Sequence, residues 1–403
     1  MSVTKTPKQR SIVPERSRGR VAFLAVRAVA VACLAAALPF ACSKDIDIEE
    51  APGFVPRIRV LLSDKLDKAE ISIAGPYEVF LPGVQLDAQK LTSGDELSSR
   101  AVSCMGGDVV IEGIIRTQQA VTFVPQNAPI EVNGRRYRGT LSIAVRDGKL
   151  RLINIVDLEG YLRGVVPAES YVEWPLAALG AQAVAARTYA FAKIVRRRER
   201  LFDVYASTND QAYAGIEKED ERSDAAVAAT AGQVLKHRGE IFTTFYHAVC
   251  GGSTADARIV FDDPAYPSPL RGSPCGYCDK APKCKWTKKI SRTQVAAKLK
   301  EKKIKAITLQ AIGLDGRVTQ VTIVRAAGGS RVMAGTIFRS KLRLRSTRFS
   351  VTADGADFVF EGRGWGHGVG MCQWGSREMA RNGKTAAEIF DRYYPGAKVV
   401  KEY

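Results

Sequence analysis

Short runs of alternating apolar and polar residues fill the chain between residues 57 and 156. Gly, Pro and Asn separate these runs, and the period of two predicts β-strands. The Asn-Gly step in VNGRR and the Asp-Gly step in RDGKL are typical of hairpin turns. We therefore expect this β-rich part to be largely antiparallel sheet.

The pattern changes at Pro175, where an alanine-rich segment begins and continues to about residue 200. Proline in the first turn and many alanines predict a long helix. The pattern also predicts several later elements: helices at 223–231, 291–302 and near 376–393, strands at 306–313, 317–325 and 348–361, and an irregular cysteine-rich loop at 250–286. The expected fold class is α+β, with mixed, largely antiparallel sheets and a C-terminal helix.

The first 42 residues have the layout of an export signal. Seven Lys and Arg against one Glu precede an apolar run from Ala28 to Cys42, which is too short to span a bilayer comfortably. Cys42 resembles the lipid-modified cysteine of a bacterial lipoprotein, although Pro39 replaces the usual leucine. Signal cleavage, lipidation and a retained membrane anchor all remain open, and each predicts an exported protein of the cell envelope. Residues 43–56 predict a linker.

The formal net charge of the 403 residues is +18, and +12 of it lies beyond residue 42. A basic surface attracts polyanions such as cell-wall polymers, acidic lipids or nucleic acid. The arginines at 196–198 and the lysines between 298 and 305 are typical of solvated helix faces. No nucleic-acid-binding motif accompanies them, so we expect no nucleic-acid partner.

Glu169 is a candidate general acid. It lies in LEGYLRGVVPAESYVEWP among apolar residues, and such surroundings raise the pKa of a carboxyl group. From the residues alone, the sequence favours the alternative, in which Glu169 merely decorates a loop or favours a helix N-terminus by its charge. Asp157, Glu159 and Glu173 are rival carboxylates, and standard glycosidases use two.

Two further segments carry candidate sugar-binding residues. Asp210, Gln211 and Tyr213 in TNDQAYAG could bind hydroxyl groups or form a plain turn. In GRGWGHGVGMCQWG, residues 362–375, glycines permit close backbone approach and tryptophans can stack on sugar rings. The candidates there are Trp365, His367, Gln373 and Trp374, and the alternative is a buried tight turn with both tryptophans in the core.

A histidine and several cysteines suggest either a metal site or disulfides. His247, Cys250, Cys275 and Cys278 include a CxxC step and could complete a tetrahedral Zn²⁺ site. An exported chain meets oxidising conditions, and six cysteines remain after residue 42, which is an even number. For Cys275, Cys278 and Cys284 the sequence favours disulfides slightly over metal.

Four stretches in this order resemble the SpoIID/LytB family over residues 54 to 403. They are DLEGYLRGVVPAES with the following WPLAALGAQAVAARTYA, then DQAYAG, then GQVLKHRGEIFTTFYHAVCGGST, and finally GRGWGHGVGMCQWGSREMA. The resemblance implies a β-rich N-terminal part at 57–156 and a core at 157–403 that contains a β-rich segment at 287–361. Members of the family include lytic transglycosylases acting on peptidoglycan glycan strands, and amidase enhancers.

The resemblance also implies roles for individual residues. Glu169 matches the catalytic glutamate, with Ser170 where the family commonly has Met. The implied substrate-binding residues are Arg187, Tyr189, Asp210, Gln211, Tyr213, His247, Trp365, His367, Gln373 and Trp374. Some members are thought to bind Zn²⁺ near His247 and Cys250, so a structural Zn²⁺ is compatible with the family although no cofactor is required. In relatives, Ser often occupies the position of Cys372.

The resemblance favours a lytic transglycosylase that cleaves MurNAc–GlcNAc bonds with a single Glu as acid and base. The product would be a 1,6-anhydromuramyl end, and the partner would be the glycan strand. The alternative is a non-catalytic glycan-binding module that stimulates a cell-wall amidase. A Zn²⁺-dependent wall hydrolase ranks last, because the paired histidines usual at catalytic zinc are missing.

Overall fold

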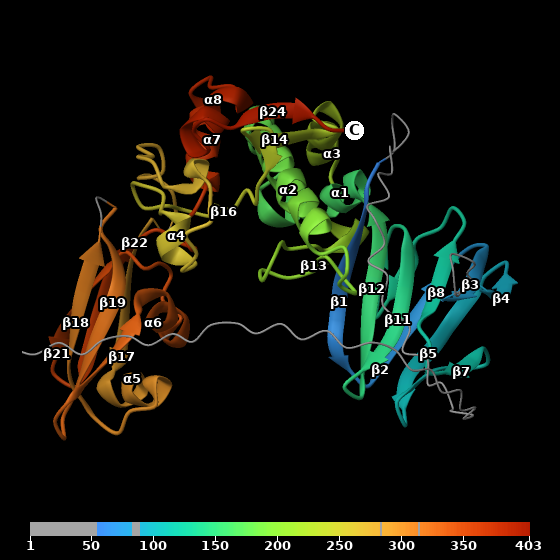
Figure 1. The fold of residues 1–403 in the computed structure, drawn as a ribbon, viewed down its shortest axis with the longest axis horizontal. Helices are drawn as coiled ribbons and strands as arrows, with labels where there is room; N and C mark the ends of the chain where they lie inside the picture. The colour runs from blue at the N-terminus through green and yellow to red at the C-terminus, as the bar shows by residue number, and fades with distance from the viewer. Residues whose placement is uncertain (1–54, 83–88, 283, 313–314) are drawn as a thin grey trace, which may run out of the picture. The chain divides into compact units, whose positions relative to one another are not determined.

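The computed structural model describes residues 55–82, 89–282, 284–312 and 315–403 (Figure 1). The expected export signal and most of the expected linker at 43–56 lie outside these residues. Within the described part, no helix combines the length and the apolar character needed to cross a membrane. The elements form mixed, mostly antiparallel sheets with helices, which confirms the expected α+β class.

Two sheets form the N-terminal β-rich part (Figure 1). The first has the order β13-β1-β12-β11-β8-β3-β4, with bounds Val204–Tyr205, Arg57–Leu66, Lys149–Asp157, Thr140–Arg146, Val121–Pro125, Tyr77–Leu81 and Gln89–Gly94. The second has the order β10-β9-β2-β5-β6-β7, with bounds Arg135–Tyr137, Ile130–Val132, Lys68–Ile73, Leu97–Met105, Asp108–Ile111 and Ile115–Thr117. Apolar residues at alternate strand positions bury one shared core.

Both predicted hairpins are present. Arg135 pairs with Val132 across Asn133-Gly134, and Arg146 pairs with Lys149 across Asp147-Gly148. All four turn residues have positive φ, between 51° and 77°, as a two-residue turn of this type requires.

Helix α1, Leu158–Glu169, follows β12 directly and was not expected from the sequence. Gly160, Gly164 and Pro167 lower its intrinsic helix propensity. Two features compensate: Asp157 caps the first turn by accepting from the Gly160 N–H at 2.7 Å, and a face of apolar residues is buried. Glu169 is therefore the last residue of a helix rather than part of a loop.

The long predicted helix is α2, Leu176–Arg196, which begins directly after Pro175. It contacts α1, the shorter helix α3 (Glu221–Ala229) and both C-terminal helices. It also contacts β14 of the sheet β15-β14-β24, whose strands have the bounds Glu240–Ile241, Gln233–His237 and Lys398–Lys401. The short helical turn η1, Gly215–Lys218, contacts α1 and β10. Strands β16 (Tyr246–His247) and β23 (Met371–Cys372) pair in parallel and join residues far apart in the sequence.

The expected C-terminal helix near 376–393 is two helices, α7 (Gln373–Arg381) and α8 (Ala386–Tyr393). The break has a local cause: Gly383 has φ +76°, and Thr385 and Glu388 form a capping box that starts α8. A short helix, α4 (Ala257–Val260), and a helical turn, η2 (Ser268–Leu270), lie in the cysteine-rich loop.

Residues 285–363 are here called the inserted lobe (Figure 1). They have their own apolar core. The lobe contains two three-stranded sheets: β17-β22-β21, with bounds Lys285–Ser291, Asp357–Arg363 and Phe349–Asp354, and β18-β19-β20, with bounds Ile304–Ile312, Arg317–Arg325 and Ser330–Ala334. Helices α5 (Arg292–Leu299) and α6 (Gly335–Leu342) pack against each other. The strand expected at 348–361 is thus a hairpin, and α6 was not expected.

Candidate active site

A cavity of about 680 Å³ lies at the C-terminal end of α1. Its walls come from segments far apart in the sequence: residues 167–174, 217–220, 248–249, Pro282, Trp365 and 373–374. Of the residues that the sequence predicted to form the site, Glu169, Trp365, Gln373 and Trp374 line this cavity together. The glycine-rich segment therefore meets the Glu169 segment in space.

Glu169 has the environment expected of a general acid. The Oε1 atom of its side chain accepts from the backbone N–H of Ala212 at 2.6 Å. Burial raises the pKa of the Glu169 carboxyl, and hydrogen bonds from Ala212 and Gln373 only partly oppose this rise. The carboxyl consequently keeps its proton to a higher pH than an exposed glutamate does.

Gln373, the first residue of α7, connects the glycine-rich segment to α1 and α2. Its Nε2 donates to the backbone carbonyl of Glu169 at 3.0 Å and to Oε1 of Gln182 at 3.4 Å. Gln373 is buried, so these bonds form in surroundings where a lost partner is costly.

Aromatic rings form much of the cavity wall. Tyr171, Trp174 and Trp374 make a cluster with centroid separations of 5.7, 6.0 and 5.4 Å. Trp365 is 39% exposed, and the guanidinium of Arg345 lies over its ring at 5.0 Å. Apolar ring faces beside a carboxylic acid suit the binding of a sugar.

Four other carboxylates line the cavity, and three of them are held by protein groups. Glu217 pairs with Arg136, Glu219 pairs with Arg138 and Arg163, and Asp220 caps α3. Burial raises the pKa of Glu217, but hydrogen bonds from Arg136 outweigh this effect and leave that pKa below its ordinary value. The fourth carboxylate, Glu173, is exposed.

The glycines of the segment 362–375 serve close packing against the protein's own backbone. Gly370 has φ +69°, and a Cβ atom there would lie 1.9 Å from the carbonyl oxygen of Phe245. A Cβ atom on Gly366, which has φ +110°, would lie 2.8 Å from Cβ of His247. Close approach was expected toward a ligand, and at these two positions it is toward the segment 245–247.

Asp210 and Tyr189 lie in the interior, outside the cavity wall. The Tyr189 hydroxyl donates to Oδ1 of Asp210 at 2.6 Å, and the backbone N–H of Tyr205 donates to Oδ2 at 3.0 Å. Lys193 forms an ion pair with Asp210 at 3.2 Å. These bonds fix the start of the segment 210–213.

Gln211 and Tyr213 are also buried. Gln211 donates to the hydroxyl of Tyr246 at 2.9 Å, and the Tyr213 hydroxyl donates to Asn154 at 2.9 Å. Ala212, between them, presents its N–H to Glu169. The segment that was expected to bind sugar hydroxyls with its side chains instead contacts the candidate acid through its backbone.

Arg187 has no exposed surface and lies outside the cavity. Its Nη2 and Nε atoms pair with the carboxylate of Glu159 at 2.7 and 2.8 Å, and Nη2 also donates to the carbonyl of Val227. The expected groove residue is therefore part of the packing between α2, α1 and α3.

His247 and His367 neighbour each other, with ring centroids 5.6 Å apart, and neither lines the cavity. Nδ1 of His247 donates to the carbonyl of Val369 at 3.0 Å, and Nδ1 of His367 accepts from the N–H of Val369 at 3.1 Å. Burial lowers the pKa of His247 well below its usual value and lowers that of His367 to about 4. Both rings are therefore neutral at pH 7.

Four buried cysteines form a cluster that could hold a metal ion. The sulfurs of Cys250, Cys275, Cys278 and Cys372 all lie within 4.8 Å of one another. Cys372 thus occupies the place expected for His247, because the parallel pair β16–β23 brings the 250 and 372 segments together. Cys284 is buried outside this group, and every cysteine in the described part of the chain is a free thiol, so the expected disulfides are absent there.

The cluster fits a tetrahedral thiolate site. Ligands at about 2.3 Å from a Zn²⁺ ion would have sulfurs roughly 3.8 Å apart, which agrees with the observed grouping. Backbone N–H groups of Cys250, Gly252 and Gly375 donate to the sulfurs at 3.3 to 3.4 Å, and such bonds stabilise thiolates.

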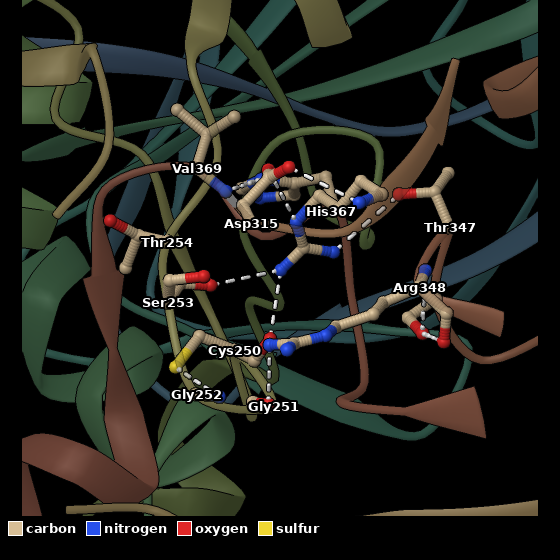
Figure 2. Close-up of polar contacts among 12 residues, drawn as sticks. Cys250, Gly251, Gly252, Ser253, Thr254, Asp315, Thr347, Arg348, His367 and Val369 are labelled. Atoms are coloured by element: carbon tan, nitrogen blue, oxygen red, sulfur yellow. Dashed lines mark hydrogen bonds and ion pairs between the residues drawn. The ribbon is translucent and has the colours of Figure 1, made fainter. Parts of the chain in front are cut away.

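Two arginines of the inserted lobe hold the loop that carries Cys250. Nη2 of the buried Arg317 donates to the carbonyls of Cys250 and Ser253 at 2.8 and 3.3 Å. Nη1 of Arg348 donates to the carbonyl of Gly251 at 2.8 Å (Figure 2). The sequence analysis missed both arginines, since nothing in their local pattern separates them from the many exposed ones.

Comparison with known proteins finds matches for two segments of the chain. A family model described as stage II sporulation protein (SpoIID) matches residues 146–237, which contain α1, α2 and the 210–213 segment. A second model, described as a domain of unknown function (DUF8618), matches residues 279–370 and so includes the inserted lobe.

Three relatives cover larger parts of the chain. An uncharacterized protein of Brachyspira hyodysenteriae is 32% identical over 350 residues, which is 85% of this chain and 92% of that protein. Stage II sporulation protein D of Bacillus subtilis is 28% identical over 278 residues, covering 64% of this chain and 79% of that protein. The amidase enhancer of Bacillus subtilis is 26% identical over 351 residues, 72% of this chain but 48% of the relative.

Proposed function

The chain belongs to the SpoIID family, and from this premise we propose that it is a peptidoglycan lytic transglycosylase. In this proposal it cleaves the bond between MurNAc and GlcNAc in glycan strands and leaves a 1,6-anhydromuramyl end. The observation that carries the proposal is Glu169: a half-buried carboxyl of raised pKa at the wall of a cavity of about 680 Å³ lined by aromatic rings.

One acid/base residue is enough for this reaction. Protonated Glu169 gives its proton to the oxygen that leaves C1 of MurNAc, and the bond between C1 and that oxygen breaks. The Glu169 carboxylate then takes the proton of the C6 hydroxyl of the same sugar, and the C6 oxygen bonds to C1. The residue ends protonated as it began, and no water molecule is consumed.

The groups around Glu169 support this cycle. The Ala212 N–H stabilises the carboxylate between the two proton transfers, while burial raises the pKa of the carboxyl and so favours its protonated form. Tyr171, Trp365 and Trp374 offer ring faces for the sugars, and the buried Trp174 packs against Tyr171 and Trp374. In this proposal Asp210, Gln211, Tyr213 and Arg187 act through packing rather than through contact with the strand.

We propose that the four-cysteine cluster holds a structural Zn²⁺. A tetrahedral site with four cysteine ligands leaves no open position for substrate, and its role would be to join the 250–278 loop to Cys372. The ion would supply folding free energy and no chemistry of the cleavage.

We also propose that the protein acts outside the cytoplasm, in the cell envelope, where its substrate lies. The basic and apolar order of residues 1–42 supports export, with attachment through a retained signal or a lipid at Cys42.

The second candidate function is enhancement of a cell-wall amidase, and the relative that is named amidase enhancer favours it. Such a protein would bind glycan in the same cavity without using Glu169 as an acid. Its partner would be the amidase in addition to the strand.

Digestion of purified glycan strands separates the two candidates. Wild type and Glu169→Gln are incubated with strands, and the products are analysed by mass spectrometry. Anhydromuramyl ends formed by wild type alone support the transglycosylase. If both proteins form these ends equally, the transglycosylase proposal is contradicted. It is also contradicted if neither forms them and both stimulate an amidase equally. Glu173→Gln is the matched control, because Glu173 lines the same cavity but is exposed.

A further inference from the structure

The positive charge of the chain is concentrated in the inserted lobe. Residues 285–363 contain eighteen Lys and Arg against five Asp and Glu, a net charge of +13. Residues 1–42 carry +6 of the total of +18, so segments 43–284 and 364–403 together carry −1. The basic excess beyond the export signal is therefore a property of the lobe alone.

Part of this charge gathers on one patch, here called the basic patch: Lys288, Lys298, Arg343 and Arg345. Nζ of Lys288 donates to the carbonyls of Leu342 and Arg343 at 3.0 Å, which joins β17 to the end of α6. Burial lowers the pKa of Lys288, and the nearby charges of Lys298, Arg343 and Arg345 lower it further. None of the four side chains forms an ion pair with a carboxylate of the described residues.

The basic patch is continuous with the wall of the Glu169 cavity. Arg345 places its guanidinium over the ring of Trp365 at 5.0 Å, and its carbonyl accepts from the N–H of Gly366 at 2.9 Å. Trp365 itself lines the cavity. A glycan strand that stacks on Trp365 and extends beyond it would next meet the positive charge of the basic patch.

We propose that the basic patch binds carboxylates of the glycan strand where the strand leaves the Glu169 cavity. This inference rests on the proposed function and adds to it that the preferred substrate is an anionic strand. MurNAc carries a lactyl carboxyl group, free or extended by a peptide that itself ends in a carboxylate, so the strand offers negative charge at regular intervals. Exposed lysine and arginine side chains attract such a polymer over about 10 Å at moderate salt.

A glycan explains the position of the patch better than the other polyanions do. Nucleic acid and an acidic membrane would bind basic residues anywhere on the lobe, with no need for contact with the cavity. The aromatic residue next to the patch, Trp365, belongs to the cavity wall rather than to a separate stacking surface.

The test measures binding of the full chain with Glu169→Gln, so that cleavage does not interfere. Lys298→Gln with Arg343→Asn removes two patch charges, and Asn suits the left-handed backbone of Arg343, which has φ +52°. The matched control is Arg198→Gln with Lys398→Gln, two exposed residues outside the lobe. Co-sedimentation is measured with insoluble strands at about 50 mM and about 500 mM salt.

We expect the patch variant to bind roughly fivefold more weakly at low salt, with the difference vanishing at high salt. The control variant should bind like the parent. Strands whose carboxyl groups have been converted to amides should bind both variants equally weakly.

Three results would overturn the proposal. The first is an equal loss of strand binding in the control variant, and the second is unchanged strand binding by the patch variant. The third is patch-dependent binding to phosphatidylglycerol vesicles or duplex DNA that is tighter than binding to the strands. Failure of the proposed function would look different, because wild type and Glu169→Gln would then form anhydromuramyl ends equally, or neither would form them, whatever the patch binds.

Discussion

The side-chain amide of Gln373 donates to the backbone carbonyl of Glu169 at 3.0 Å, across 204 positions of sequence. Gln373 begins α7 and Glu169 ends α1, so this bond joins the glycine-rich segment to the candidate acid. The same side chain also lowers the pKa of Glu169, against the stronger effect of burial. Gln373 therefore sets both the position and the acidity of that carboxyl.

Gln373→Met should lower kcat by about 10- to 100-fold and change KM little, because a buried hydrogen bond worth roughly 1–3 kcal/mol is lost. The pH at which activity falls should move upward, since an influence that lowers the pKa of Glu169 is removed. Initial rates on glycan strands across pH check both effects. A fall in kcat that matches the unfolded fraction, with an unmoved pH profile, would show that Gln373 acts on stability alone.

Activity should depend on pH through a single carboxyl group that must start protonated. Burial raises the pKa of Glu169, so kcat/KM should stay high at acidic pH and fall as pH rises through a value above that of an ordinary glutamate, about 4.5. The profile of kcat/KM against pH measures it. A falling limb below the ordinary glutamate value would contradict the assignment of Glu169 as the acid. Glu173→Gln should leave the pH at which kcat/KM falls unchanged.

The features that the sequence predicted well are those that depend on neighbours in the chain. The Asn133-Gly134 and Asp147-Gly148 turns and the helix after Pro175 follow from local backbone preferences, and all three are present. Helix α1 was missed because its glycines and proline disfavour a helix locally, and burial of its apolar face outweighs them. Burial of that face depends on segments distant in sequence.

Prediction of the site was limited in the same way. The types of residue at 187, 189 and 210–213 suit either a groove or a buried polar network, and only the packing of α2 decides between them. Cys372 joins the cysteine cluster through the parallel pairing of β16 and β23, and the spacing of cysteines along the sequence does not predict this pairing. The sequence placed Glu169 in one site with Trp365, Gln373 and Trp374 because the order of the motifs resembles the family, and no geometric argument supported that prediction.

Arg187→Met should destabilise the fold by about 3–5 kcal/mol, because it leaves the Glu159 carboxylate without its buried partner. Denaturant unfolding at pH 7 measures the change. Strand binding by the remaining folded protein should be unchanged, since Arg187 lies outside the cavity. Adding Glu159→Gln should restore part of the stability. A binding defect without loss of stability would instead support a groove role.

The cysteine cluster should hold one zinc ion per chain. Metal analysis of the purified protein checks the content, and Cys372→Ser should lower it and lower Tm by several degrees, because a ligand of a structural site is lost. Cys284→Ser is the matched control: Cys284 is equally buried but outside the cluster, so zinc content should not change. Equal zinc in wild type and Cys372→Ser would rule out the four-sulfur site.

Arg317 should control how firmly the cluster holds its metal. Its guanidinium fixes the carbonyls of Cys250 and Ser253, and its positive charge lies beside sulfurs that would carry a net negative charge in the metal complex. Arg317→Met keeps the length of the side chain but removes both effects, and it should weaken zinc retention about 10-fold or more. Competition with a chromogenic chelator measures this change. Arg331→Met is the control, because Arg331 pairs with Glu301 within the lobe and does not contact the 250–253 loop. If both variants lose zinc to the same extent, the effect comes from general loosening of the lobe, and Arg317 has no specific role at the cluster.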